Sequence, residues 1–301
     1  MPLAQRSVDA LAGRVSVHLS TCWDWNLAEA IVAFESLGLA RVGVWRRRLE
    51  EFGEERGVEL LRDHRVVPSS LSWAGGFTGQ GGVTLREAHW DAAVALDHAR
   101  AIGAPALLVT TGGRSGHSRG HLGRLLREEL PIVGDNAAER GVRALVHVAG
   151  GTATSRWSCL NSVGHALDVV QQCRHSALGL AVDLRGLARD KGAIDRLPEL
   201  IPHLGLVLLR EFPGPEIDAP ERKPEQDLRW VVARLESAGY RGHYELHLPP
   251  RRVAPEQYAV VLRHYRARLA NCLAVAHSLI ATPAATPAVL PAAEVVRIAR
   301  A

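Results

Sequence analysis

Short apolar runs recur along the chain, and longer segments with a mixed apolar and polar pattern separate them. Each run has the length and the branched or aromatic content of a buried β-strand. We predict eight strands from these runs: Val15–Leu19, Arg41–Trp45, Val67–Ser72, Ala106–Thr110, Arg143–Val148, Gly179–Asp183, Gly205–Arg210 and His243–His247.

The segments between the strands carry apolar residues at helical spacing. In the first of them Ile31, Phe34 and Leu37 recur on one face, and Asn26 precedes them as a helix cap. Gly38 follows at the position of a left-handed C-cap. The predicted helices are Leu27–Leu37, Glu50–Asp63, Leu85–Ile102, His121–Gly141, Ser162–Cys173, Ile194–Leu204, Asp227–Ala238 and Pro255–Leu279.

The regular alternation of strand and helix predicts a parallel sheet of the α/β class. Eight strands, seven crossovers and a closing helix indicate a (β/α)8 TIM barrel. An open, doubly wound sheet is the alternative, but no GxGxxG motif follows the first strand. We expect a single barrel domain over residues 14–280, an N-terminal arm over 1–13 and a flexible Pro/Ala-rich C-terminal arm over 281–301.

Composition narrows the class of protein. Hydrophobic residues make up 47% of the chain, and the four cysteines form no CxxC pair, which predicts a globular, cytoplasmic protein. We expect no signal peptide and no membrane span. A net charge of +4 is too small to favour nucleic-acid binding, so Arg46–Arg48 is interpreted as a solvated helix face. The C-terminal arm ends in a helical pattern suited to docking on a neighbour, which predicts a homodimer.

Titratable residues gather where the predicted strands end, which is where TIM barrels carry their active sites. His147, Asp183 and His247 stand at equivalent depth on three strands, and His18 lies near the end of the first strand. A lone histidine at a strand end is usually structural, and Asp183 is also suited to capping the next helix. Burying all of them together costs several kcal/mol unless they are paired or used, so their joint occurrence indicates a site.

Five segments carry a family resemblance: SLGLARVGVW, ERGVRALVHV, SCLNSVGHALDVV, LGLAVDLRG and AGYRGHYELH. In their order and spacing they resemble the xylose isomerase-like superfamily over about residues 14 to 275. That superfamily includes sugar phosphate isomerases and epimerases, inosose dehydratases and 3-dehydroshikimate dehydratases. The resemblance implies the same barrel and an isomerase or lyase activity.

The resemblance also implies a divalent metal, held by acidic or histidine ligands on the last four strands. Those positions are His147, Asp183, Leu208 and His247 here, so one family ligand is kept. Leucine cannot bind a metal, and histidine suits Mg²⁺ poorly. We therefore predict that no cofactor is needed. If a metal is present, His147, Asp183 and His247 would hold it, and Zn²⁺, Fe²⁺ or Mn²⁺ would suit this set.

Histidine titrates near neutral pH and can transfer protons without a metal. We predict a lyase or isomerase that abstracts a proton next to a carbonyl or hydroxyl carbon in a dehydration, epimerisation or related rearrangement. One of His147 and His247 would be the general base and the other the general acid. Asp183 would orient or charge one imidazole, and Arg185 or Arg210 would stabilise the negative charge that develops.

The expected substrate is a small molecule that is less polar than a sugar phosphate, such as a large or aromatic intermediate of a biosynthetic pathway. Tryptophans near the strand ends offer flat apolar surfaces. The resemblance adds an acidic residue after the seventh strand and an arginine before the last helix. The predicted substrate-binding residues are His18, Trp45, Trp73, Arg185, Arg210, Glu211 and Arg222.

Two other functions remain open from the sequence. One is a metal-dependent sugar isomerase or epimerase with the altered His-Asp-His ligand set. The other is a non-catalytic barrel that lost its metal and kept its pocket. A nuclease is disfavoured because the chain lacks most of a three-metal ligand set and is not strongly basic.

Overall fold

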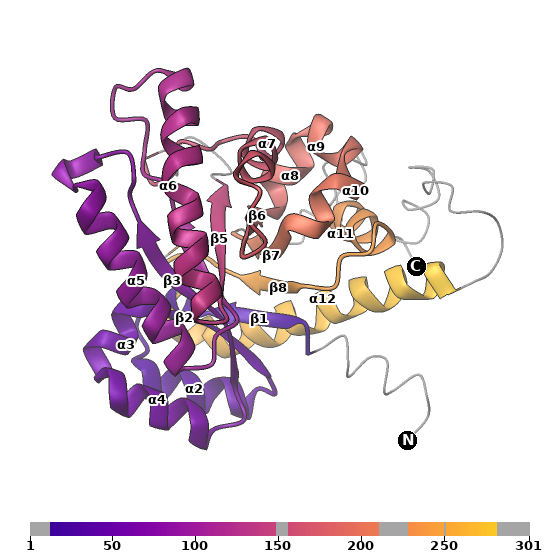
Figure 1. Cartoon of the computed structure of the whole chain (residues 1–301). Coiled ribbons are helices and arrows are strands. Elements are labelled where there is room, and N and C mark those ends of the chain that lie inside the picture. Colours follow the sequence, from indigo (N-terminus) through magenta and orange to yellow (C-terminus); the bar gives the residue numbers. More distant parts are fainter. Residues whose placement is uncertain (1–12, 149–155, 211–227, 250, 282–301) are drawn as a thin grey trace.

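The computed structural model describes residues 13–148, 156–210, 228–249 and 251–281 (Figure 1). Eight parallel strands form a closed barrel in sequential order, because the first strand also pairs with the last. The fold predicted from the sequence is therefore confirmed. The strands are β1 (Val15–His18), β2 (Arg41–Trp45), β3 (Val67–Gly75), β4 (Ala106–Thr110), β5 (Arg143–Val148), β6 (Leu178–Asp183), β7 (Leu204–Leu209) and β8 (His243–Leu246).

Helices cover the outside of the barrel (Figure 1). They are α2 (Leu27–Ser36), α3 (Arg46–Phe52), α4 (Glu54–Asp63), α5 (Leu85–Ala101), α6 (Arg119–Glu139), α7 (Val163–Cys173), α8 (Leu184–Arg189), α9 (Lys191–Asp195), α10 (Leu197–Leu200), α11 (Leu228–Ser237) and α12 (Tyr258–Ala281). None of these described helices is long and apolar enough to cross a membrane. Residues 1–12 and 282–301, which hold most of the two predicted arms, lie outside the described residues.

Two predicted helices differ from the structure. The single helix expected over Glu50–Asp63 is two helices, α3 and α4, which meet at Gly53. Gly53 has a φ of 97°, a left-handed value that ends a helix and that glycine adopts without strain. The helix expected at Ile194–Leu204 is instead the end of α9, the short helix α10 and a 3-10 turn over Ile201–His203. A further short helix, α8, begins directly after β6.

Side chains of the strands alternate between two environments, as a closed barrel requires. Leu107 and Val109 of β4 pack outward in the main core beneath the helices, whereas Leu108 between them points into the barrel. The apolar side chains inside the barrel come from β4 to β7: Ala106, Leu108, Leu145, Ala181, Leu206 and Leu208. The opposite inner wall, from β1, β2, β3 and β8, is polar, and it carries the candidate site.

Candidate active site

A buried carboxylate occupies the polar half of the barrel interior. Glu245 of β8 is fully buried, and its Oε2 accepts hydrogen bonds from Ser69 Oγ at 3.1 Å and Ser70 Oγ at 2.9 Å. Gly43 of β2 makes room for it, since a Cβ at that position would overlap the Glu245 carboxylate. A buried carboxylate is costly unless it is hydrogen-bonded, and these two serine hydroxyls offset part of that cost.

Two imidazoles stack beside this carboxylate. His18 ends β1, His247 follows β8, and their rings lie 3.8 Å apart between centroids with 8° between their planes. His18 is fixed on both nitrogens, with Nδ1 2.8 Å from Ser20 Oγ and Nε2 2.6 Å from Ser72 Oγ. His247 is held differently. Its Nδ1 lies 3.6 Å from Glu245 Oε1, and within the described part of the chain neither atom has a hydrogen-bond partner.

The electrostatics of the stack keep both rings neutral near pH 7. Burial lowers the pKa of His18 well below its ordinary value, and the neighbouring His247 lowers it further. Burial also lowers the pKa of His247, followed by the charge of Arg210 and the presence of His147. Neutral imidazole is the form that accepts a proton or binds a metal.

His147 is the third buried histidine of the site. It points inward from β5 with 2% of its surface exposed, and neither of its ring nitrogens has a partner among the described residues. Burial, and then the charge of Arg210, lowers its pKa to about 3. Trp73 lies between the two histidine sites, with its ring centroid 5.0 Å from that of His147 and 5.3 Å from that of His247. Buried polar atoms without partners usually mark a position that a ligand or ordered water fills.

Asp183 and Arg210 are two further charged residues of the candidate site. Asp183 ends β6 and caps α8, because its Oδ1 accepts a hydrogen bond from the Gly186 backbone N–H at 2.8 Å. The capping role considered from the sequence is therefore present. Burial lowers the pKa of Arg210, and the charge of Asp183 opposes that effect. The charge of Arg210 in turn lowers the pKa of both His147 and His247.

The structure also brings together a possible metal-ligand set. Among the described residues, His18, Glu245 and His247 form a buried group whose ligand atoms all lie within 4.8 Å of one another, so this group could hold a metal ion. The set differs from the His147–Asp183–His247 set expected from the sequence, and it shares only His247 with it. Leu208, at the position of the third family ligand, is fully buried in the apolar half.

The remaining predicted substrate-binding residues are dispersed. Trp73 lies in the site, whereas Trp45 packs against Trp23 with 5.1 Å between ring centroids. Arg185 lies in the first turn of α8. Glu211 and Arg222 lie outside the described residues.

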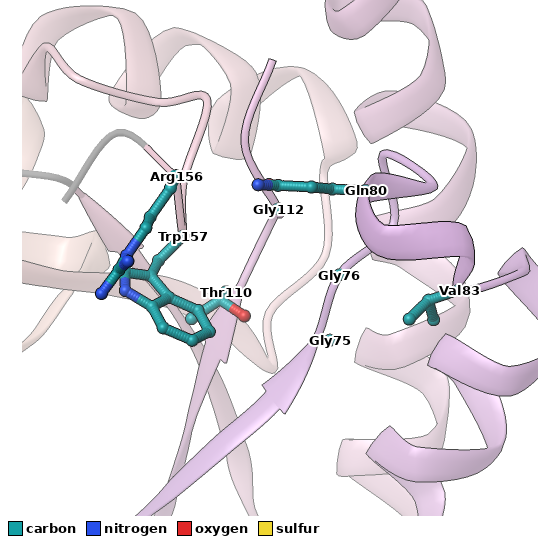
Figure 2. A pocket seen from close by; sticks show the side chains of 8 residues that line it. All are labelled: Gly75, Gly76, Gln80, Val83, Thr110, Gly112, Arg156 and Trp157. Atoms are coloured by element: carbon teal, nitrogen blue, oxygen red, sulfur yellow. The ribbon is translucent and has the colours of Figure 1, made fainter. Parts of the chain in front are cut away.

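Sequence reasoning missed two features of the site. Glu245 stands two residues before His247, and period-two alternation places both side chains on the inner face of β8, so this signal was present. The second feature is a pocket beside the mouth that Trp157 and Arg156 line (Figure 2). No sequence pattern indicated its position.

Comparisons with known proteins agree with the barrel fold. The family model described as xylose isomerase-like TIM barrel matches residues 32–268. None of the curated protein sequences matches the chain. Among solved structures, the chain is similar to the IolI protein with a bound zinc atom, with 14% identity, a TM-score of 0.68, and coverage of 88% of this chain and 98% of that one.

Two sugar epimerases have similar structures. For 3-keto-D-glucoside 4-epimerase from E. coli the identity is 14%, the TM-score 0.67, and the coverage 84% of this chain and 99% of that one. For D-psicose 3-epimerase from Clostridium cellulolyticum H10, which was solved with D-tagatose, the identity is 12%, the TM-score 0.65, and the coverage 88% and 97%. At these identities the likeness concerns the fold alone.

Proposed function

We propose that this chain, which belongs to the xylose isomerase-like TIM barrel family, is an isomerase or lyase that moves a proton at a carbon next to a carbonyl or hydroxyl group of a small molecule. The observation that carries the proposal is His147. Its imidazole is buried at the barrel mouth with both nitrogens unpartnered among the described residues, and the charge of Arg210 helps to lower its pKa. A base next to a cation is the arrangement that proton abstraction next to a carbonyl needs.

The two histidines take complementary roles. His147, neutral because burial lowers its pKa to about 3, is available as the base. Negative charge that develops on the substrate oxygen is stabilised by Arg210, and the charge of Asp183 favours the charged form of that guanidinium. His247 is the acid, because a neutral imidazole still carries one ring N–H that it can donate, and Glu245 Oε1 lies 3.6 Å from its Nδ1. None of these steps requires a metal.

A second candidate function is supported by the His18–Glu245–His247 group. Two imidazoles and one carboxylate suit Zn²⁺, and Glu245 Oε1 and His247 Nδ1 have no hydrogen-bond partner in the described chain. His18 would have to give up the serine hydrogen bond of one ring nitrogen to bind the ion. The structurally similar IolI protein was solved with zinc. When bound, the ion would supply Lewis-acid polarisation of a substrate carbonyl. In this case the enzyme would be a metal-dependent epimerase with a ligand set of its own.

Deuterium exchange tests the main proposal. The purified protein would be incubated in D2O with a panel of hydroxy-ketones, and NMR would follow exchange of the C–H next to the carbonyl. We expect exchange in the wild-type protein and a loss of about 10²-fold or more in His147→Ala and in His247→Ala.

His203→Gln is the matched control, because His203 lies just before β7 at the opposite end of the barrel and should leave exchange intact. Circular dichroism would verify that each variant is folded. Full exchange in both histidine variants would refute the proposal. A ligand that binds and is recovered without exchange or conversion would instead indicate a non-catalytic binding barrel.

A further inference from the structure

A pocket of about 390 Å³ opens beside the mouth, between the ends of β3 and β4 and the segment that leads into α7. Figure 2 shows Trp157 close to Thr110 on one side of the pocket and Val83 on the other. Small-molecule pockets span about 300–1,000 Å³, so this volume suits a ligand portion with a single ring.

Hydrogen bonds between the segments hold the pocket walls in place. The Gly112 N–H donates to the Trp157 carbonyl oxygen at 3.0 Å, and the Gly113 N–H donates to Gln80 Oε1 at 2.6 Å. Gly112 also pairs with Ser158 in an isolated parallel bridge. The walls are therefore positioned before a ligand enters, which reduces the entropic cost of binding.

One wall of the pocket is bare backbone. Gly75, Gly76 and Gly112 have φ values of 115°, 101° and 86°, which side chains rarely tolerate. A Cβ on Gly112 would overlap the Thr78 hydroxyl, whereas a Cβ on Gly76 would meet no heavy atom within 4 Å. These glycines give a smooth surface against which a flat group can lie.

The other wall combines an exposed indole with a cation. Trp157 is 56% exposed, and the Arg156 guanidinium lies 5.2 Å from the centroid of its ring. Arg156 is the one charged side chain among the eight lining residues, and no carboxylate is among them. A large exposed aromatic surface beside a cation favours a flat apolar ring that carries a negative charge.

We infer that this pocket binds an aromatic ring bearing a carboxylate, as the distal part of the substrate of the proposed reaction, and in that respect the inference rests on the proposed function. Ser158, next to Trp157, donates a hydrogen bond from Oγ to the carbonyl oxygen of His147 at 3.0 Å. The pocket wall is thus tied to the strand that carries the proposed base.

Binding of a simple probe tests the inference without any turnover. The probe is 4-hydroxybenzoate, compared with cyclohexanecarboxylate, which keeps the charge without the flat ring, and with benzyl alcohol, which keeps the ring without the charge. Calorimetry at millimolar concentrations and saturation-transfer NMR would measure binding to the wild-type protein and to Trp157→Ala and Arg156→Gln. Trp90→Ala is the matched control, since Trp90 is 68% exposed on α5.

We expect 4-hydroxybenzoate to bind better than either comparison compound. Trp157→Ala should weaken its binding roughly tenfold, and Trp90→Ala should not change it. Arg156→Gln should weaken binding of 4-hydroxybenzoate but not of benzyl alcohol. Absence of 4-hydroxybenzoate binding, or equal binding in Trp157→Ala and wild type, would overturn the inference.

These experiments distinguish failure of the proposed reaction from failure of the proposed pocket. His147→Ala should keep its affinity for 4-hydroxybenzoate, because the probe does not use the histidine. If the probe binds as expected and no hydroxy-ketone undergoes exchange, the proposed reaction is wrong and the pocket stands. If exchange depends on His147 and the probe does not bind, the reaction stands and the pocket is wrong.

Discussion

The imidazole of His247 stacks on that of His18, with 3.8 Å between ring centroids and 8° between planes. The stack exists because β1 and β8 close the barrel in parallel register, with Val17 opposite Leu246. His18, the next residue on β1, then lies beside His247, the first residue after β8. Burial lowers the pKa of both rings, so both imidazoles are neutral. They lie close to the carboxylate of Glu245. This arrangement permits both proton transfer and metal binding, and experiment can separate the two.

Removal of metal distinguishes the two candidate mechanisms. We expect protein treated with a chelator and dialysed to exchange hydroxy-ketone protons at the same rate as untreated protein, because His147, His247 and Arg210 suffice for the proposed step. Elemental analysis of both samples, made alongside the exchange assay, would establish how much metal each contains.

A loss of exchange that Zn²⁺ restores would favour the metal-dependent alternative. Two variants would then locate the ion. Glu245→Gln should abolish Zn²⁺ binding if His18, Glu245 and His247 hold it, whereas Asp183→Asn should abolish binding if the ligands are the ones expected from the sequence.

The pH dependence of the unfolding free energy should reflect the titration of His147. Its folded-state pKa is about 3 against an ordinary value of 6.5, so between these values the unfolded chain binds more protons than the folded one. The stabilisation is complete above about pH 6.5 and is lost as the pH falls toward 3. Relative to His147→Gln, the wild-type protein should lose about 2 kcal/mol of unfolding free energy between about pH 7 and pH 5.

Urea denaturation at several pH values would measure this difference. His147→Asn also removes the titrating group, so it should flatten the pH dependence in the same way even if its absolute stability differs. Parallel curves for the wild type and both variants would show that His147 titrates alike in the folded and unfolded states.

The barrel could be predicted because each strand has a recognisable local sequence pattern. Runs such as Ala106–Thr110 and Arg143–Val148 are short and apolar, and they agree with the observed strands. The break at Gly53 was missed because a single glycine within a helical pattern can either be tolerated or end the helix.

The site could be predicted only in part. Period-two alternation places His147, Asp183 and His247 inside the barrel, but it does not say which of them meet. Glu245 accepts hydrogen bonds from two serines of β3, and the absence of a side chain at Gly43 of β2 leaves room for its carboxylate. These contacts join residues far apart in the chain. Only the closed barrel brings them together.

Gly43 should be intolerant of a side chain. In Gly43→Ala the added methyl group would overlap the Glu245 carboxylate and displace it from Ser69 and Ser70, which should cost about 1–3 kcal/mol of stability. Thermal and urea denaturation would measure the change. Because the two positions are in contact, the Gly43→Ala/Glu245→Ala double variant should lose less stability than the two single changes predict together.

Gly120→Ala provides the control for this experiment. Gly120 lies near the start of α6, and a Cβ there would meet no heavy atom within 4 Å, so alanine should stabilise the protein by up to about 1 kcal/mol. Equal effects of the two substitutions would mean that Gly43 is not needed to accommodate the carboxylate.

The salt bridge between Arg14 and Glu236 should be a main support of barrel closure. Arg14 Nη1 and Nη2 bind the Glu236 carboxylate at 2.7 and 2.8 Å, and the Tyr244 hydroxyl donates to the same carboxylate at 2.7 Å. Glu236 is fully buried in α11, so these bonds tie the residue that precedes β1 to α11 and β8. Removing the guanidinium leaves a buried charge without its main partner.

Arg14→Ala should therefore lower the unfolding free energy by about 3–5 kcal/mol in urea denaturation. Arg47→Ala is the matched control, because Arg47 pairs with Glu51 at 2.7 Å on the surface, with 61% and 41% of the two side chains exposed. That change should cost less than about 1 kcal/mol. An Arg14→Met/Glu236→Leu double variant should recover much of the loss, since it removes both buried charges. If Arg14→Ala costs no more than Arg47→Ala, the buried pair does not support closure of the barrel.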